Sequence, residues 1–456
     1  MGFEVFSYKS KLPVPASEAF AWHARPGAFE RLNPPWDPAR VIEQVGGIQN
    51  GARVVIELKL GPLPVRWVAE HGDYVPGVRF KDTQVSGPFA AWIHEHRFAQ
   101  EGAGCTLEDH IDYKLPLGAL GKFFAGGMIK KKLNAMFAYR HRVTQADFAT
   151  LNSRKVDAMT ILIAGSSGVV GSALVPFLTT SGQKVSRLVR REANASKGEI
   201  SWSPDTGGID QAAVEQANAV VNLAGENIAG RWSQSRKKAI RESRIKSTRL
   251  LAEALARSSS RPKVFVCASA IGYYGNRGDT PLDESSGPGE GFLADVCKEW
   301  EDATKPAVEA GIRVVNLRIG IVLTPAGGAL AKMLTPFKLG LGGVMGSGDQ
   351  YWSWVAIDDV LGAIAHALFT DSVSGPVNVV APRAATNREF TQELGRVLSR
   401  PTIFPMPAFA ARLALGEMAD ALLLSSARVA PKKLSEAGYK FRFPQLDMAL
   451  RHVLGK

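Results

Sequence analysis

The sequence predicts an α/β protein with a doubly wound parallel sheet and a small helical C-terminal lobe, preceded by a smaller α+β domain. In the segment 159–171, a short apolar run leads directly into three glycines spaced three apart. Further along, apolar runs alternate with helical segments, which builds a parallel sheet covered by helices. The strand-like runs are 219–224, 264–268 and 314–317, and the helical segments are 233–257 and 293–310.

Length and composition indicate a globular protein of more than one domain. The 456 residues exceed one ordinary core, so two or three domains are expected. Hydrophobic residues make up 45% and charged residues 21% of the chain, as in globular proteins. The net charge of +12 is compatible with nucleic acid, an anionic membrane or acidic nucleotide ligands, and equally with no acidic partner. The dense basic run Lys130–Lys132 is interpreted as a solvated helix face, and no nucleic acid partner is predicted.

The cysteines and the N-terminus indicate the cellular compartment in which the protein is expected. Cys105, Cys267 and Cys297 are dispersed and odd in number, which argues against a disulfide framework or a zinc site and for a reducing compartment. The N-terminus lacks the apolar core of a signal peptide, and no run reaches the roughly 18 apolar residues of a membrane span. We therefore expect a cytoplasmic protein without a membrane span.

A polar stretch divides the chain into two predicted domains. Residues 149–158, ATLNSRKVDA, stand just before the glycine segment. The first domain is predicted at 1–150, the linker at 151–158, and the second domain at 159–456. From about residue 382 the second domain becomes helical, as expected of a lobe on the substrate side.

The first domain reads as strands followed by a long closing helix. An alternating strand and a helix from about Pro15 precede five strand-like runs: 53–60, 65–71, 78–85, 91–99 and 105–115. An amphipathic helix over 117–148 follows. Six of its side chains are expected to be available for burial: Phe123, Phe124, Met128, Leu133, Phe137 and Tyr139.

This pattern resembles the START-like fold, also called polyketide cyclase-like or SRPBCC. In that helix-grip family the long helix covers a curved sheet and an apolar cavity. The resemblance implies an apolar ligand for residues 1–150. The apolar side chains can equally be interpreted as ordinary core.

The glycine loop has the features of a dinucleotide-binding site. Gly165 allows a tight turn, Gly168 lets the backbone approach a pyrophosphate, and Gly171 lets the following helix pack close to the strand. The phosphates would lie at the N-terminus of that helix, which begins near Val169. The predicted cofactor-binding residues of the loop are Gly165, Ser166, Ser167, Gly168, Val169, Val170 and Gly171.

The strand after the loop indicates which cofactor binds. The apolar run 185–189 ends in Arg190 and Arg191, near the position about 20 residues past the glycines where an acidic residue would hold a ribose 2′-hydroxyl. Two arginines there favour a 2′-phosphate, so NADP is predicted over NAD. The alternative is a solvated pair on a basic protein.

Three further stretches resemble the extended short-chain dehydrogenase/reductase family, which adopts the Rossmann fold. They are 220–225, 265–275 and 353–360. The resemblance implies that the end of the first stretch passes beneath the cofactor, and that the second presents a catalytic Ser or Thr. The added cofactor-binding residues are Asn222, Leu223, Ala224 and Gly225.

Longer strings narrow this resemblance. NLAGENIAGRW (222–232), SAIGYYG (269–275), FLADVCKEWE (292–301) and the tail segments 400–420 and 425–441 resemble an atypical epimerase-family group, also called nucleoside-diphosphate-sugar epimerase-like. Its members carry a C-terminal domain of unknown function, and some bacterial members have a START-like domain in front. The resemblance implies the fold and NADP binding, without supplying a substrate.

The catalytic residues depart from the wider family, which uses a Tyr four residues before a Lys. Lys298 would be the Lys, also contacting the ribose, but Ala294 stands at the Tyr position, and Phe292 and Leu293 are equally inert. Ser269 fits the serine position if Gly272 is an insertion, and otherwise Ala270 takes it.

Replacements for the absent Tyr exist nearby. Tyr273 is the leading candidate and completes the predicted catalytic set of Ser269 and Lys298. Other candidates are Tyr274, Glu226, Asp295 and Cys297. Each has a structural interpretation beside the catalytic one, as a packed ring, a buried helix residue or a solvated helix face.

The leading functional hypothesis is an NADP(H)-binding epimerase- or reductase-like protein that transfers hydride to or from an unknown carbonyl or sugar-nucleotide substrate. The alternative is an inactive NADP-binding redox or ligand sensor, which the absent Tyr favours. In the first domain, His94 and His96 share one face of a strand around Glu95. No third ligand is evident from the sequence, so an ordinary strand and no metal are predicted.

Overall fold

The computed structural model describes residues 2–61, 63–152 and 157–456. The chain forms two compact units, one built mainly from residues 1–157 and the other mainly from residues 158–454. Residues 153–156 of the predicted linker lie outside the described residues. None of the helices that the structure describes combines the length and the apolar composition needed to span a membrane.

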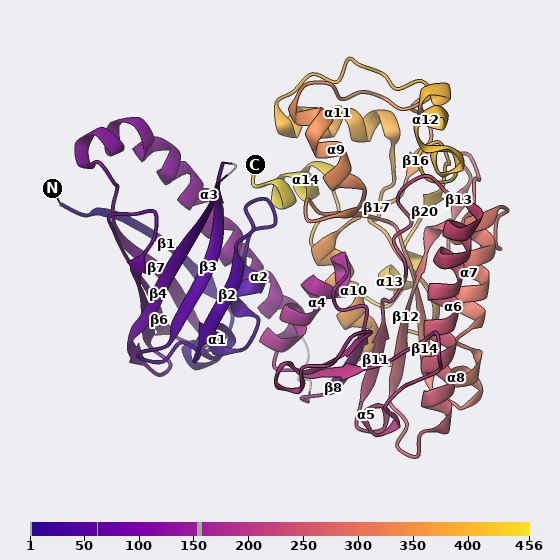
Figure 1. The fold of residues 1–456 in the computed structure, drawn as a ribbon, viewed down its shortest axis with the longest axis horizontal. Helices are drawn as coiled ribbons and strands as arrows, with labels where there is room; N and C mark the ends of the chain where they lie inside the picture. The colour runs from indigo at the N-terminus through magenta and orange to yellow at the C-terminus, as the bar shows by residue number, and fades with distance from the viewer. Residues whose placement is uncertain (1, 62, 153–156) are drawn as a thin grey trace. The chain divides into compact units, whose positions relative to one another are not determined.

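The first unit is a seven-stranded antiparallel sheet with a long helix against it (Figure 1). The strand order is β1-β7-β6-β5-β4-β3-β2. The strands are β1 (Glu4–Leu12), β2 (Arg40–Val45), β3 (Arg53–Leu60), β4 (Leu63–Val75), β5 (Arg79–Ser86), β6 (Ala91–Glu101) and β7 (Gly104–Lys114). The helices are α1 (Ala16–Ala24), α2 (Ala28–Leu32) and α3 (Gly118–Asn152). This arrangement confirms the predicted helix-grip fold.

Alternation along the strands defines the inner face of this sheet. In β7, every second side chain from Cys105 to Tyr113 is buried, as expected for a strand with one face in the core. Leu133 and Phe137 of α3 join the same cluster as Ile111 and Tyr113. Asp109 is buried in the middle of this alternation.

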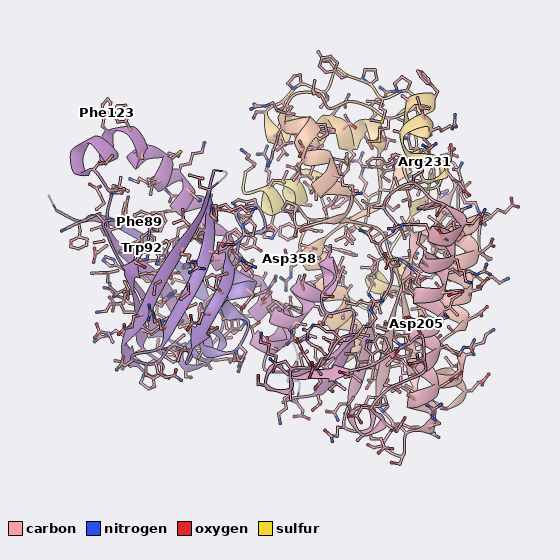
Figure 2. All side chains as sticks on the ribbon, in the orientation of Figure 1. Phe89, Trp92, Phe123, Asp205, Arg231 and Asp358 are labelled. Atoms are coloured by element: carbon pink, nitrogen blue, oxygen red, sulfur yellow. The ribbon has the colours of Figure 1, made fainter. Side chains whose placement is uncertain are left out.

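The prediction that six apolar side chains of the long helix are available for burial was wrong for the three in its first turns. Phe123, Phe124 and Met128 are exposed, Phe123 at 84%, whereas Leu133 and Phe137 are buried. Figure 2 shows Phe123 near the start of α3. The reason is length: 35 residues of helix measure about 52 Å, whereas the 11-residue strand β7 measures about 37 Å.

One strand of this sheet was not predicted. β2 lies at the edge of the sheet, and its burial pattern shows mostly exposed side chains. An edge strand without a buried face lacks the alternation of apolar and polar residues from which a strand is predicted.

The second unit is a seven-stranded parallel sheet in the order β10-β9-β8-β11-β12-β14-β18. Its strands are β8 (Thr160–Ala164), β9 (Lys184–Val189), β10 (Glu199–Ser201), β11 (Ala219–Asn222), β12 (Val264–Ala270), β14 (Arg313–Ile319) and β18 (Gly375–Val379). The helices along the sheet are α4 (Val169–Thr180), α5 (Gln211–Glu215), α6 (Gln234–Arg257), α7 (Phe292–Asp302), α8 (Lys305–Glu309) and α10 (Ile357–Phe369). The doubly wound Rossmann sheet is confirmed.

Short strands and helices complete this unit. They are η2 (Ile271–Tyr274), β13 (Pro281–Leu282), β15 (Ile321–Leu323), α9 (Gly328–Lys338), β16 (Tyr351–Trp352), β17 (Trp354–Ala356), β19 (Ala385–Thr386), α11 (Asn387–Leu398), α12 (Ala408–Leu415), β20 (Arg428–Val429), α13 (Lys432–Glu436) and α14 (Leu446–Leu454). Trp352 and Trp354 are buried in the core beside α9 and α11.

The strand order reverses direction between β8 and β11. From β8 the chain first adds β9 and β10 on one side, then returns to add β11, β12 and β14 on the other. Ligands of open α/β sheets bind at such a switch point, outside the carboxyl ends of the strands. The glycine loop after β8 and the segment after β11 both lie there.

Candidate functional site

The glycine loop is shaped by backbone contacts that exclude side chains. Gly165 has a φ of +79°, and a Cβ on it would lie 2.5 Å from the carbonyl carbon of Leu223. A Cβ on Gly171 would lie 2.2 Å from the carbonyl oxygen of Gly165. Glycine is therefore required at both positions, because real Cβ atoms do not approach backbone so closely.

Gly168 has a different environment. Its amide donates to Gly165 O (3.1 Å), and its carbonyl accepts from Ser172 N (2.8 Å) in the first turn of α4. A Cβ on Gly168 would meet Gly165 O at 3.4 Å, and no other heavy atom is found within 4 Å. Ser167, Gly168 and Val169 are exposed. The space before the N-terminus of α4 is thus open, which fits a pyrophosphate group.

The segment after β11 is held against this loop. Leu223 N donates to Ala164 O at 2.9 Å. The buried Asn222 side chain donates to Thr248 Oγ1 (2.8 Å) and accepts from Ala224 N (3.1 Å). The Asn222 side chain therefore shapes the turn that follows β11, and Leu223 and Ala224 form the wall beside Gly165.

Arg244 was not identified from the sequence. It lies on α6, and a Cβ on Gly225 would come within 3.2 Å of its Cζ. Its guanidinium also lies 5.0 Å from the centre of the Trp300 ring. Burial lowers the pKa of Arg244 from its ordinary value. A positive charge therefore lies beside the predicted cofactor segment. Arg244 could not be recognised from the sequence, because it stands in an ordinary charged helix.

The two arginines after β9 have different environments. Arg191 donates to both carboxylate oxygens of Glu199 at 2.8 Å. These bonds lower the pKa of Glu199 to about 2. Arg190 is exposed at the carboxyl end of β9. Of the two, Arg190 is therefore better placed to meet a ligand, while Arg191 is committed to Glu199.

Ser269 belongs to a buried polar network at the carboxyl ends of β12 and β14. Its hydroxyl donates to Glu301 Oε1 at 2.7 Å. Glu301 in turn accepts two bonds from Arg318, both at 2.8 Å. The strand register places Ser269 directly opposite Arg318. Burial opposes the charge of Arg318, but Glu301 outweighs it, and the pKa of Arg318 is raised.

The two tyrosines after Ser269 differ in their contacts. The Tyr274 hydroxyl accepts from Arg318 (3.0 Å) and donates to Asn378 Oδ1 (2.8 Å). Burial raises the pKa of Tyr274. The Tyr273 ring is half-buried and lies 3.4 Å from the Arg318 Cζ. Tyr274 is thus an anchored core residue, and Tyr273 is the more accessible of the two.

The orientation of α7 decides which of its residues face Ser269. A Cβ on Gly272 would meet Leu293 Cβ at 3.3 Å and Cys297 Sγ at 3.7 Å. Glu301, another four residues along, bonds Ser269, so positions 293, 297 and 301 form one face. Lys298 lies on the exposed side of the helix. The structure brings Ser269 together with Tyr273 and Tyr274 but leaves Lys298 outside this group.

The remaining acid/base candidates are also placed. Cys297 is buried, and burial raises its pKa to about 12, so it is a neutral thiol at pH 7. Asp295 is exposed. Glu226 is half-buried, and its carboxylate lies 3.9 Å from an Arg236 nitrogen. Glu301 and Arg318 were not singled out from the sequence, although a charged residue inside the apolar run of β14 was an available signal.

The first unit contains its own cluster of ionisable side chains. On the inner face of its sheet, Asp109 Oδ1 lies 2.8 Å from His94 Nε2, and Asp109 Oδ2 lies 2.6 Å from His141 Nε2. Burial opposes the charge of His94, but Asp82 and Asp109 outweigh it and raise its pKa to about 9. Burial lowers the pKa of His23, on α1, to about 4.

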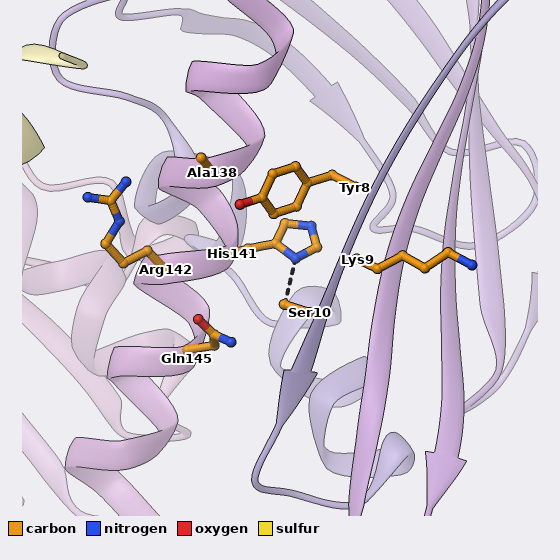
Figure 3. Close-up of a pocket in the computed structure, with 7 residues that line it drawn as sticks. All are labelled: Tyr8, Lys9, Ser10, Ala138, His141, Arg142 and Gln145. Atoms are coloured by element: carbon orange, nitrogen blue, oxygen red, sulfur yellow. Dashed lines mark hydrogen bonds between the residues drawn. The ribbon is translucent and has the colours of Figure 1, made fainter.

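A pocket of about 420 Å³ adjoins this cluster between β1 and α3 (Figure 3). It is lined by Tyr8, Lys9, Ser10, Ala138, His141, Arg142 and Gln145. Ser10 Oγ lies 2.6 Å from His141 Nδ1. The lining is thus largely polar. In the second unit, a pocket of about 500 Å³ lies between α11 and the segment before α14, and none of the predicted site residues lines it.

Three family models match the chain. Residues 161–380 match the NAD dependent epimerase/dehydratase family, and residues 406–453 match a domain of unknown function, DUF1731. Residues 12–137 match the family described as polyketide cyclase / dehydrase and lipid transport. The predicted resemblances of both units are confirmed.

Relatives and solved structures agree. An epimerase family protein of Mycobacterium tuberculosis is 45% identical over 294 residues, covering 64% of this chain and 97% of that protein. Human epimerase family protein SDR39U1 is 35% identical, covering 65% and 100%. A structure described as the nucleoside-diphosphate sugar epimerase of Corynebacterium glutamicum has a TM-score of 0.82 at 33% identity, covering 99% and 90%. The human SDR39U1 structure with NADPH has a TM-score of 0.60 at 35% identity, covering 65% and 99%.

The second unit therefore belongs to the class of NAD(P)-dependent epimerase/dehydratase Rossmann domains. Within that class, the chain belongs to the atypical short-chain dehydrogenase/reductase group of SDR39U1-like epimerase family proteins, here with a START-like unit in front.

Proposed function

We propose that the second unit binds NADPH and transfers hydride to or from a small carbonyl or sugar-nucleotide substrate. The observation that carries this proposal is the open space at Gly168 between two glycines that admit no side chain. The human relative whose structure is described as containing NADPH supports the choice of cofactor. When bound, the cofactor would supply the hydride in its reduced form and accept it in its oxidised form.

Residues of this chain would bind the cofactor and orient the substrate. The amides at the start of α4 would hold the pyrophosphate, and Arg190 would hold the 2′-phosphate. The backbone of Leu223 and Ala224 supports the cofactor from the β11 side. Ser269 would orient the substrate oxygen, and Tyr273 would exchange its proton. We also propose Lys298 as a contact of the ribose. For this contact its side chain would have to reach across the edge of α7.

The cofactor proposal is tested by calorimetric titration of the full chain with NADPH and NADH. Arg190→Glu places a negative charge beside the 2′-phosphate and should weaken NADPH binding at least about tenfold, with little effect on NADH. Lys184→Glu is the matched control, because it makes the same charge change at the opposite end of β9. Equal binding of both cofactors to the parent protein, or equal losses in both variants, contradicts the assignment of NADP.

One observation favours a second candidate function, a sensor that binds NADPH without turnover. The face of α7 toward Ser269 carries Leu293, Cys297 and Glu301: a hydrocarbon, a neutral thiol and a carboxylate that Arg318 holds through two hydrogen bonds. Oxidation of NADPH on addition of any of a panel of aldehydes, diketones and sugar nucleotides supports the enzyme. Tight NADPH binding with no turnover across the panel supports the sensor.

A further inference from the structure

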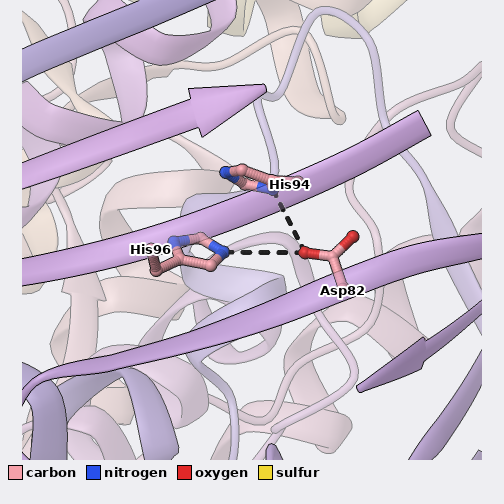
Figure 4. Close-up of side chains that lie close together, drawn as sticks. All are labelled: Asp82, His94 and His96. Carbon is pink, nitrogen blue, oxygen red and sulfur yellow. Dashed lines mark ion pairs between the residues drawn. The ribbon is translucent and has the colours of Figure 1, made fainter. Parts of the chain in front are cut away.

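Asp82, His94 and His96 of the first unit direct three potential metal-ligand atoms toward one point (Figure 4). One atom from each side chain lies within 4.8 Å of the other two. In the sequence, the two histidines share one face of a strand, and no third ligand is evident. The third ligand comes from the neighbouring strand.

The sheet register brings these residues together. Asp82 on β5 pairs directly with His94 on β6, and His96 lies two residues further along β6. Side chains that are opposite across strands, or two apart along one strand, share a face of the sheet. That face is the inner one, because His94 is buried while Asp82 and His96 keep side-chain exposures of 18% and 12%. An ion can therefore enter from the side of Asp82 and His96.

The two nitrogens of each ring have different surroundings. On one side, His94 Nε2 and His96 Nδ1 lie 2.8 Å and 2.7 Å from the same oxygen of Asp109. On the other side, His94 Nδ1 and His96 Nε2 lie 3.2 Å and 3.7 Å from Asp82 Oδ2. Of the first pair, His94 Nε2 is hydrogen-bonded to Asp109, whereas His96 Nδ1 is close to it but has no hydrogen-bond partner among the described residues. The second pair of distances is at or beyond the end of the hydrogen-bond range.

The wider spacing matches a metal site. Ligands at about 2.0–2.1 Å from a tetrahedral Zn²⁺ are separated from one another by about 3.3 Å. The separations of 3.2 Å and 3.7 Å between Asp82 and the two histidines lie close to this value, and the two ring nitrogens lie within 4.8 Å of each other. Side-chain rotation would bring the three atoms to the geometry of a bound ion.

Asp109 supplies the outer support that such sites require. Metal-binding histidines usually direct their other ring nitrogen to a carboxylate, which fixes the tautomer and the ring orientation. Asp109 contacts both histidines through one oxygen, and its other oxygen lies 2.6 Å from His141 Nε2. His141 also lines the pocket between β1 and α3, so the outer support of the ion reaches that pocket.

We propose that Asp82 Oδ2, His94 Nδ1 and His96 Nε2 bind a divalent transition-metal ion such as Zn²⁺, with Asp109 orienting the His94 imidazole. Two imidazoles and one carboxylate favour Zn²⁺, Co²⁺ or Fe²⁺ over Mg²⁺, which prefers oxygen ligands. Three protein ligands leave at least one coordination position for water or an oxygen-bearing ligand. The site is independent of the nucleotide site, since all of its residues lie in the first unit.

The experiment uses the full chain, stripped of metal with a chelator and titrated calorimetrically with Zn²⁺ alone. Co²⁺ is followed by its visible absorption, which is intense for four-coordinate geometry, and Mg²⁺ serves as the selectivity control. We expect one Zn²⁺ per chain and no competition by Mg²⁺. Asp82→Asn and His96→Gln each remove a direct ligand, so each should weaken Zn²⁺ binding. The expected loss exceeds the ~10–100-fold that is typical when a residue supporting a ligand is removed.

His110→Gln is the matched control. His110 lies on β7 next to Asp109, so its side chain points to the opposite face of the sheet. Circular dichroism verifies the fold of each variant, and Asp82→Asn, which keeps the side-chain shape, decides the matter if His96→Gln unfolds. Retained Zn²⁺ affinity in a folded ligand variant, or an equal loss in His110→Gln, overturns the proposal. So does the absence of stoichiometric binding to the parent chain, while NADPH binding reports separately on the second unit.

Discussion

Two glycines of the cofactor loop should respond differently to the same substitution. A methyl group on Gly171 would lie 2.2 Å from Gly165 O and 2.7 Å from Ser166 Cα, so α4 would have to move away from the loop. A methyl group on Gly168 meets only Gly165 O, at 3.4 Å. Gly171→Ala therefore perturbs the fold, whereas Gly168→Ala fills the space proposed for the pyrophosphate.

The expected magnitudes follow from these contacts. Gly171→Ala should lower the free energy of unfolding by about 1–3 kcal/mol, the usual effect of overpacking against atoms that cannot rotate away. Gly168→Ala should change it by less than about 1 kcal/mol, since the contact is ordinary and a Gly→Ala change restricts the unfolded chain. Gly168→Ala should also weaken NADPH binding at least about tenfold, which corresponds to about 1.4 kcal/mol of binding free energy.

Urea denaturation and NADPH calorimetry of both variants provide the test. Gly168→Ala that is folded and binds NADPH as tightly as the parent would refute the placement of the pyrophosphate. Gly171→Ala with unchanged stability would refute the backbone overlap on which the argument for this helix depends.

Three further predictions concern buried ionisable groups. Glu301→Gln leaves Arg318, which is 3% exposed, without its carboxylate partner and should lower the free energy of unfolding in urea by about 3–5 kcal/mol. Glu299→Gln on the same helix removes an exposed partner of Arg241 and should change it by at most about 1 kcal/mol. Equal effects of the two variants would contradict the role of the buried ion pair. The pKa of His23 is about 4 when folded and 6.5 ordinarily, so the unfolded chain protonates first and roughly 3 kcal/mol of stability is lost as pH falls from 6.5 to 4. His23→Phe should reduce that slope in urea titrations, and an unchanged slope would show that other groups cause it. All three cysteines are buried, with the pKa of Cys297 raised to about 12, so a thiol reagent at pH 8 should label none until denaturant is added; rapid native labelling would contradict the burial.

Local patterns in the sequence predicted the fold well. The apolar run before Gly165 and the alternation of later strands with helices were sufficient for the parallel sheet, because each buried strand has a characteristic composition. β2 was not predicted, because an edge strand with exposed side chains lacks that signal. The burial of Phe123 was wrongly predicted because helical periodicity does not reveal where the neighbouring sheet ends.

The sites were predictable only where one segment contains them. The glycine loop is a single stretch of chain, so its geometry could be inferred from spacing. The contacts of Ser269 with Glu301, and of His94 with Asp82, depend on register between segments that are distant in sequence. Asp109 was nevertheless visible as the one acid among the alternate positions 105, 107, 109, 111 and 113 of β7, where the other residues are apolar or aromatic. A buried acid of that kind needs partners, and the structure supplies three histidines.

The assignment of a proton donor near Ser269 can be decided between two adjacent tyrosines. Tyr274 is held by Arg318 and Asn378, so removing its hydroxyl leaves buried polar groups without a partner. Tyr274→Phe should therefore destabilise the protein by about 1–3 kcal/mol. Tyr273 is half-buried and stacks on Arg318 through its ring, so Tyr273→Phe keeps that stacking and should leave stability nearly unchanged.

Turnover should respond in the opposite way. If Tyr273 transfers the proton, Tyr273→Phe should lower kcat by at least about 100-fold with whichever substrate of the panel is active, with little change in the Kd for NADPH. Tyr274→Phe should retain kcat at temperatures where it is folded. Full activity in Tyr273→Phe would exclude that hydroxyl as the donor. On the facing helix, Leu293 and Cys297 offer no acid and Glu301 is held by Ser269 and Arg318, so the proton would then have to come from Glu301, Glu226, bound water or the substrate itself.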